Sequence, residues 1–206
     1  MEVYMEFTLE SDDINDYLKE SNEVDYSNPI IQRKAEELFK TNQTDVEKIQ
    51  NTFEFVRDDV SHSWDIQDEL VTCHASEVLS YQKGICYAKS NLLAALLRSQ
   101  GIPTGFCYQR LMIFDTPEKG YSLHALNAVY IKSLNKWIRL DARGNKKGVN
   151  AQFSTGKEML AFSINPEFDE IDYPIIFVEP NRKTIEALRK NNNALEMYLN
   201  YLPEKL

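Results

Sequence analysis

The segment from Gly84 to Pro103, "GICYAKSNLLAALLRSQGIP", places a cysteine directly ahead of a long apolar run. Its leucines recur at spacings of three and four residues, and the alanines between them add high helix propensity. The leucines are Leu92, Leu93, Leu96 and Leu97, and the alanines are Ala88, Ala94 and Ala95. Gly101 and Pro103 end the pattern. The segment therefore predicts a helix that begins at Cys86 and buries at least one broad face.

Downstream of this helix, the sequence changes to runs rich in β-branched and aromatic residues, which are typical of strands. The predicted strands cover residues 104–114, 124–131 and 136–142. Short polar segments between them indicate antiparallel connections. Together these patterns predict an α+β fold, in which helices pack on an antiparallel sheet and Cys86 lies at the N-terminus of the central helix.

Upstream of the central helix, three shorter helical patterns occur. Asn28 is a candidate N-cap for the first, because Pro29 follows it at the first helical position. Thr44 is the candidate cap of the second, which is amphipathic and has acids in its first turn. The third covers "HASEVLSYQKG", and we expect Gly84 to end it.

The short segment "KSLN" between the last two predicted strands defines a hairpin register. If Ile131 pairs with Lys136, then His124 lies opposite Arg143, and Asp141 becomes its diagonal neighbour on the same face. Such diagonal positions are about 7 to 8 Å apart, within reach of a hydrogen bond between the side chains. A register shifted by one residue would place them on opposite faces.

Cys86, His124 and Asp141 together have the chemistry of a nucleophile, a base and a residue that orients the base. A cysteine in the first turn of a helix lies near free backbone N–H groups, which favour the thiolate. Taken alone, Cys86 is more typical of a small buried hydrophobic residue, and His124 is more typical of a structural histidine in a strand. The three roles together favour a catalytic unit.

The sequence from "GICYAKSNLLAALLRSQGIP" through "HALNAVYI" to "KWIRLDA" resembles the core of the transglutaminase-like superfamily, which has a papain-related fold. The resemblance covers roughly Phe53 to Ala142. It implies that Cys86 is the nucleophile, that His124 is the base and that Asp141 orients it. It also implies attack on a peptide or amide carbonyl through a thioester. The chain differs from many members in having "ARGN" after the aspartate and no aromatic residue after the histidine.

The backbone N–H of Cys86 is well placed to bind the oxyanion, since it belongs to the nucleophile itself. The sequence leaves the second donor open. Trp64 in "SHSWD" is one candidate, by similarity to a tryptophan of the animal transglutaminases, and Gln82 is the other. For Trp64 the simpler interpretation is a core or rim aromatic residue.

The remaining polar candidates are given no role in the reaction. His62 and His74 are interpreted as surface or capping residues. Arg143 and Lys146 either face an acidic substrate or, more simply, belong to a solvated loop. Neither the histidines nor the cysteines have the ligand spacing of a zinc site, and no Asp-rich calcium loop occurs, so we expect no metal and no cofactor.

Composition limits the partners and the compartment. The chain of 206 residues has 23 basic against 32 acidic side chains, a formal net charge of -9, so it would repel nucleic acid. It contains no apolar run long enough to span a membrane and no secretory signal pattern. The odd number of cysteines (Cys73, Cys86 and Cys107) is incompatible with a complete disulfide framework. We therefore expect a cytoplasmic protein with a peptide or protein substrate.

The expected organisation is a single domain over residues 1–206, with a core at about 44–145 and helical additions at both ends. The expected function is that of a cysteine-dependent hydrolase or acyl transferase, of protease, amidase or transglutaminase type. Two alternatives remain at the level of the sequence: a peptide-binding module without catalysis, and an acyl transferase similar to the arylamine acetyltransferases. The sequence does not indicate an oligomeric state.

Overall fold

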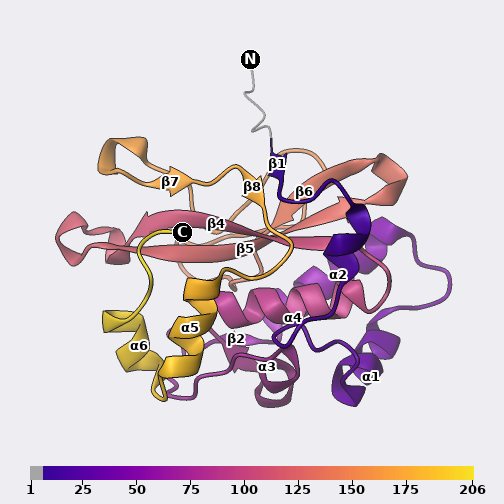
Figure 1. Ribbon diagram of the computed structural model, residues 1–206, viewed down its shortest axis with the longest axis horizontal. Coiled ribbons are helices and arrows are strands. Elements are labelled where there is room, and N and C mark those ends of the chain that lie inside the picture. Colours follow the sequence, from indigo (N-terminus) through magenta and orange to yellow (C-terminus); the bar gives the residue numbers. More distant parts are fainter. Residues whose placement is uncertain (1–6) are drawn as a thin grey trace.

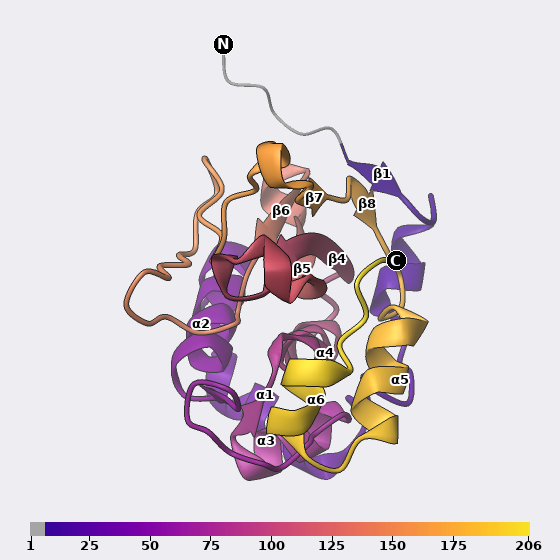
Figure 2. The same ribbon diagram turned by 90° about the vertical axis from the view of Figure 1, so that its left-hand side faces the viewer.

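An antiparallel sheet forms one layer of the computed structural model, which describes residues 7–206 (Figure 1). The order of its strands is β6-β5-β4-β7. Their bounds are Thr104–Met112 for β4, Tyr121–Ile131 for β5, Lys136–Leu140 for β6 and Ile171–Asp172 for β7. The helices α1, α3 and α4 lie together beneath the sheet in both views (Figures 1 and 2). The predicted α+β class and antiparallel sheet are confirmed, although β7 is an additional strand.

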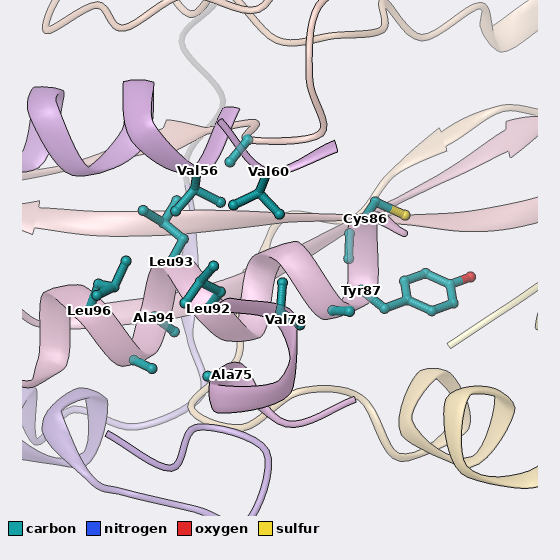
Figure 3. Packing of buried hydrophobic residues seen from close by; sticks show 14 of the residues in the cluster. Val56, Val60, Ala75, Val78, Cys86, Tyr87, Leu92, Leu93, Ala94 and Leu96 are labelled. Atoms are coloured by element: carbon teal, nitrogen blue, oxygen red, sulfur yellow. The ribbon is translucent and has the colours of Figure 1, made fainter. Parts of the chain in front are cut away.

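The central helix α4, Cys86–Arg98, is buried on every side. Its leucines contact the sheet and the neighbouring helices, as Figure 3 shows for Leu92, Leu93 and Leu96. Each such side chain contributes about 1.5–3 kcal/mol by leaving water. Because α4 is enclosed, its polar side chains also need partners: Asn91 Nδ2 donates to the Cys73 carbonyl over 2.9 Å. The prediction that this helix buries at least one broad face is confirmed, and the burial extends around the whole helix.

The helices before α4 begin where their caps predict. Asn28 accepts a hydrogen bond from the backbone at the start of α1, Pro29–Leu38. Thr44 forms a capping box with Glu47 at the start of α2, Asp45–Asp58. Helix α3, Ala75–Tyr81, ends earlier than we expected, because Gln82 adopts a left-handed conformation with φ of 50°. The prediction that Gly84 ends this helix was wrong.

Two pairs of short strands tie distant segments together. The first pairs β1, Thr8–Leu9, with β8, Ile175–Ile176, and the second pairs β2, Ser61–His62, with β3, Lys83–Gly84. Helices α5, Arg182–Lys190, and α6, Ala194–Asn200, follow the sheet and pack beside α4. Five 3₁₀ turns complete the described part of the chain: Ile14–Leu18, Ile113–Asp115, Pro117–Lys119, Lys132–Leu134 and Pro166–Phe168. Strand β3 leads directly into α4 and so fixes where that helix begins.

Candidate active site

Cys86 is the first residue of α4, as the sequence predicts, and its side chain lies at the end of the helix nearest the sheet (Figure 3). The preceding residue, Ile85, is the N-cap and has no side-chain acceptor. The first backbone N–H groups of α4 are therefore available to a negative charge, either on the sulfur or on a ligand. Cys86 is 8% exposed, so this charge would form largely out of water.

His124 and Asp141 meet beside the end of strand β6. The observed register pairs Ile131 with Lys136, which confirms the hairpin prediction. Strand β6 ends at Leu140, and the Asp141 side chain then reaches His124: Nε2 of the ring lies 2.8 Å from Oδ2 of the carboxylate. The backbone N–H groups of Arg143 and Ala161 donate to the same carboxylate, over 3.2 and 3.1 Å. These donors hold Asp141 in position toward the ring.

The electrostatic surroundings of His124 favour its protonated form. Burial alone would lower the pKa of the ring, but the charge and hydrogen bond of Asp141, together with the contact to Cys86, outweigh it and raise the pKa to about 10. Burial raises the pKa of the Asp141 carboxyl, yet His124 and the two backbone donors lower it overall. Because Nε2 is bonded to Asp141, Nδ1 is the ring nitrogen that is available to the Cys86 sulfur.

Phe162 fixes the plane of the His124 ring. Its ring meets that of His124 edge to face, with centroids 5.1 Å apart and an angle of 89°. Phe162 follows Ala161, whose N–H donates to Asp141, so one loop segment supports both members of the pair. No local pattern indicates this contact, because Phe162 lies in an irregular segment without periodicity.

The two proposed oxyanion donors from side chains lie in different surroundings. Trp64 is half-buried and stacks on Tyr198 of α6, with ring centroids 4.5 Å apart and an angle of 14°. Phe114, in the loop after β4, lies 5.5 Å from the same indole. Gln82 is exposed at the end of α3. Trp64 thus belongs to an aromatic group, as expected of a core or rim residue, whereas Gln82 faces solvent.

Tyr198 brings the C-terminal part of the chain to this site. Sequence reasoning missed this contribution. Burial and the nearby Cys86 raise the pKa of the tyrosine hydroxyl to about 12, while the positive charge of Arg143 opposes this. The "NALEMYLNYL" segment predicts a helix but contains no feature that marks one tyrosine for the site.

His62 is a buried residue, and its interpretation as a surface or capping residue was wrong. It is 4% exposed and meets Tyr198 edge to face at 6.1 Å between centroids. Burial and the nearby Arg143 lower its pKa well below the usual value, so the ring is neutral. His74, by contrast, does cap a helix: it is the N-cap of α3, and its Nδ1 lies 2.6 Å from the Asn22 carbonyl.

Arg143 is also buried, so the simpler account of a solvated loop was wrong for it. Its two terminal nitrogens donate to the two oxygens of Asp65, over 2.6 and 2.9 Å. Lys146 donates to Asp65 as well, over 2.7 Å. Burial would raise the pKa of the Asp65 carboxyl, but these two cations lower it to about 2. The ion pair links the segment after Trp64 to the segment after Asp141.

The other two cysteines lie in apolar surroundings. All three cysteines are free thiols. Burial raises the pKa of Cys73 to about 11 and that of Cys107 to about 12, so both stay protonated at neutral pH. Within residues 7–206, no group of three or more His, Cys, Asp and Glu side chains is arranged to hold a metal ion. In that same range, no helix is long and apolar enough to cross a membrane.

Comparisons with known proteins agree with the fold. The solved structure of a proposed cysteine protease from Cytophaga hutchinsonii is similar in fold, with a TM-score of 0.51 and 20% sequence identity. The similarity covers 65% of this chain and 43% of that one, so the chain spans less than half the length of its structural relative. No curated protein matches the chain. The sequence pattern of the transglutaminase-like superfamily matches residues 32–142, and the chain belongs to that superfamily.

Proposed function

We propose that the chain is a cysteine-dependent hydrolase or acyl transferase that acts on a peptide or amide carbonyl through a thioester. The observation that carries the proposal is the 2.8 Å contact between His124 and Asp141 beside Cys86 at the start of α4. A binding scaffold has no physical need for a nucleophile, a base and an orienting carboxylate in contact. The fold similarity to a cysteine protease chain is consistent with this reaction class.

In the proposed reaction, His124 holds the Cys86 proton and Asp141 stabilises the resulting imidazolium. The thiolate attacks the carbonyl carbon and forms a C–S bond, while the carbonyl electrons move to oxygen. The C–N bond then breaks, and the leaving amine takes the proton from His124. Water, or a second amine, attacks the thioester with His124 as base, which releases the acyl product and restores the thiol.

The oxyanion is stabilised in this proposal by the backbone N–H of Cys86. That group lies at the positive end of α4, where Ile85 leaves it without a side-chain acceptor. Trp64 is the favoured second donor, because it shares an aromatic group with Tyr198, which lies near Cys86. Gln82 is the weaker candidate because it is exposed.

The substrate in this proposal is a peptide or a protein, and hydrolysis is favoured over cross-linking. The three free thiols favour a reducing compartment, which supports the proposed cytoplasmic location. Release of ammonia or amine from a peptide panel, measured with and without an added primary amine, tests the choice of acceptor. We expect release to exceed incorporation of the added amine, and the opposite ratio would indicate a transglutaminase.

Alkylation separates this proposal from that of a peptide-binding module. We expect iodoacetamide to modify Cys86 below neutral pH faster than it modifies an ordinary exposed thiol, because the imidazolium stabilises the thiolate. The Cys86→Ala variant reports the background from Cys73 and Cys107, both buried. If Cys86 reacts no faster than an ordinary thiol, the site lacks an activated nucleophile and the binding module is favoured.

A further inference from the structure

The first half of β5 has an edge beside the candidate active site where no strand of residues 7–206 pairs with it. Strand β6 pairs with β5 only from Ile131 back to Asn127, so the residues before Asn127 have no strand on that side. Leu123 directs both of its backbone groups toward this edge: its N–H donates to the Pro203 carbonyl over 2.7 Å, and its carbonyl accepts from the Tyr87 hydroxyl over 2.7 Å. The Tyr87 hydroxyl belongs to the body of the protein, so the Leu123 N–H is the group at this edge that bonds the backbone of an extended segment.

Residues 201–206, which we call the tail, follow α6 and rise from that helix to the sheet (Figure 1), where the Pro203 carbonyl meets the Leu123 N–H at this edge. Besides the bond from Leu123 to Pro203, the tail forms an ion pair between Glu204 and Arg110. The Glu204 side chain is 51% exposed, whereas that of Arg110 is only 7% exposed. The tail therefore supplies a carboxylate to a cation that belongs to the body of the protein.

Arg110 is held in place as a receptor for a carboxylate. Its guanidinium lies 3.5 Å from the centre of the Tyr121 ring, and its Nη1 donates to the Asp169 carbonyl over 2.5 Å. Its Nε is buried and has no hydrogen-bond partner among residues 7–206. A buried cation is costly without a negative partner, so this position requires a carboxylate from some source.

The edge lies next to the reacting groups in sequence and in space. Leu123 precedes His124, and Tyr87, which bonds to the Leu123 carbonyl, follows Cys86. A peptide that pairs with this edge would therefore pass beside both the nucleophile and the base. Strand addition of this kind gives affinity through backbone bonds and specificity through side-chain pockets.

We propose that a substrate site, the edge site, is formed by the Leu123 backbone together with the side chains of Arg110 and Tyr121. An extended acyl-donor peptide with an acidic residue pairs with β5 at this site. In the free protein the tail of the same chain occupies it. The proposal rests on the proposed function for its substrate. The acidic residue follows the backbone-bonded residue in the peptide, as Glu204 follows Pro203. The tail is then an intramolecular competitor, so the substrate must displace it.

Fluorescence anisotropy with a labelled peptide of the tail sequence, Tyr-Leu-Pro-Glu-Lys-Leu, tests the edge site directly. All proteins are full-length and carry Cys86→Ala, so binding is measured without chemistry. Glu204→Arg places two cations together and releases the tail from Arg110. Removing the competitor should tighten peptide binding by at least about tenfold. Glu196→Arg is the matched control, since it makes the same charge change at an exposed acid of α6 and should leave the affinity unchanged.

Two further measurements assign the binding to Arg110. A peptide with glutamine in place of its glutamate should bind the Glu204→Arg protein about tenfold more weakly, because the charged hydrogen bond is lost. Adding Arg110→Gln should remove the difference between the two peptides. Equal affinities of the Glu204→Arg and Glu196→Arg proteins would overturn the proposal, as would equal binding of the two peptides. Peptide binding in these variants, combined with no accelerated alkylation of Cys86 in the unchanged protein, would retain the edge site and reject the proposed reaction.

Discussion

At the scale of single residues, Cys86, His124 and Asp141 should fail unequally when each is replaced. Cys86→Ala should abolish turnover, because it removes the proposed nucleophile, and His124→Ala should be nearly as severe. Asp141→Asn keeps the shape of the side chain but loses the charge that stabilises the imidazolium. Its expected loss in kcat/KM, measured on a peptide substrate, is on the order of 10² to 10⁴.

A double variant tests whether the residues act as one unit. His124→Ala combined with Asp141→Asn should be scarcely worse than His124→Ala alone, because the carboxylate acts through the ring to which it is bonded. Cys73→Ala is the control for loss of a buried thiol, and its activity should remain close to that of the unchanged protein. Losses that multiply in the double variant, or activity in Cys86→Ala, would show that the assignment is wrong.

At the scale of elements, the start of α4 depends on close packing around Gly84. A Cβ at this position would lie 2.9 Å from both the Ala88 Cβ and the Thr72 Oγ1, so α4 or its neighbour would have to move. We expect Gly84→Ala to lower the free energy of unfolding by about 1–3 kcal/mol, as overpacking does. It should also lower kcat, because Ala88 lies on the same helical turn as Cys86.

Urea unfolding and peptide kinetics together check this prediction. Gly156→Ala is the matched control, because a Cβ there would have only Ser154 Oγ within 4 Å, at 3.9 Å. Its stability and kcat should stay near those of the unchanged chain. Equal behaviour of the two alanine variants would mean that the turn before Cys86 adapts without cost.

Local patterns predicted the elements that form through neighbouring residues. The caps at Asn28 and Thr44 and the start of α4 depend on residues close in sequence, and all three are confirmed. The short loop between β5 and β6 fixes the register, and this register predicted the contact of His124 with Asp141. Strand β7, by contrast, has two residues and depends on pairing with β4 across a long segment, so it has no local signal.

At the scale of the whole molecule, the parts of the site that sequence reasoning missed come from segments that are distant in the chain. His62 is buried because Tyr198 of α6 covers it, and Arg143 is buried because Asp65 neutralises it. Neither contact has a periodicity or a motif that could reveal it. The opposite charges of Asp65 and Arg143 do not predict their pairing either, because acidic residues are frequent throughout the chain. Burial of these polar residues therefore required the tertiary structure.

Two buried bases near the site should affect global stability in opposite directions as the pH rises. Asp141 raises the pKa of His124 above 6.5, so this ring contributes stability that is complete below that pH and is lost as the pH rises through the higher value. Burial lowers the pKa of Lys89 from 10.5 to about 7, and the folded protein then binds fewer protons than the unfolded chain between those values. Lys89 therefore makes stability rise with pH over that window.

Single variants separate these two contributions. All proteins carry Cys86→Ala, so that the thiol takes no part, and urea unfolding is followed from pH 7 to pH 10. His124→Gln removes the contribution that falls with pH, so the free energy of unfolding of this variant should rise more steeply with pH than that of the background protein. Lys89→Met removes the contribution that rises with pH, so the free energy of unfolding of that variant should fall more steeply. Each change should amount to a few kcal/mol across the window. Lys40→Met, at an exposed lysine, is the control and should leave the curve unchanged. If neither buried base alters the curve, their protonation does not differ between the folded and unfolded chains.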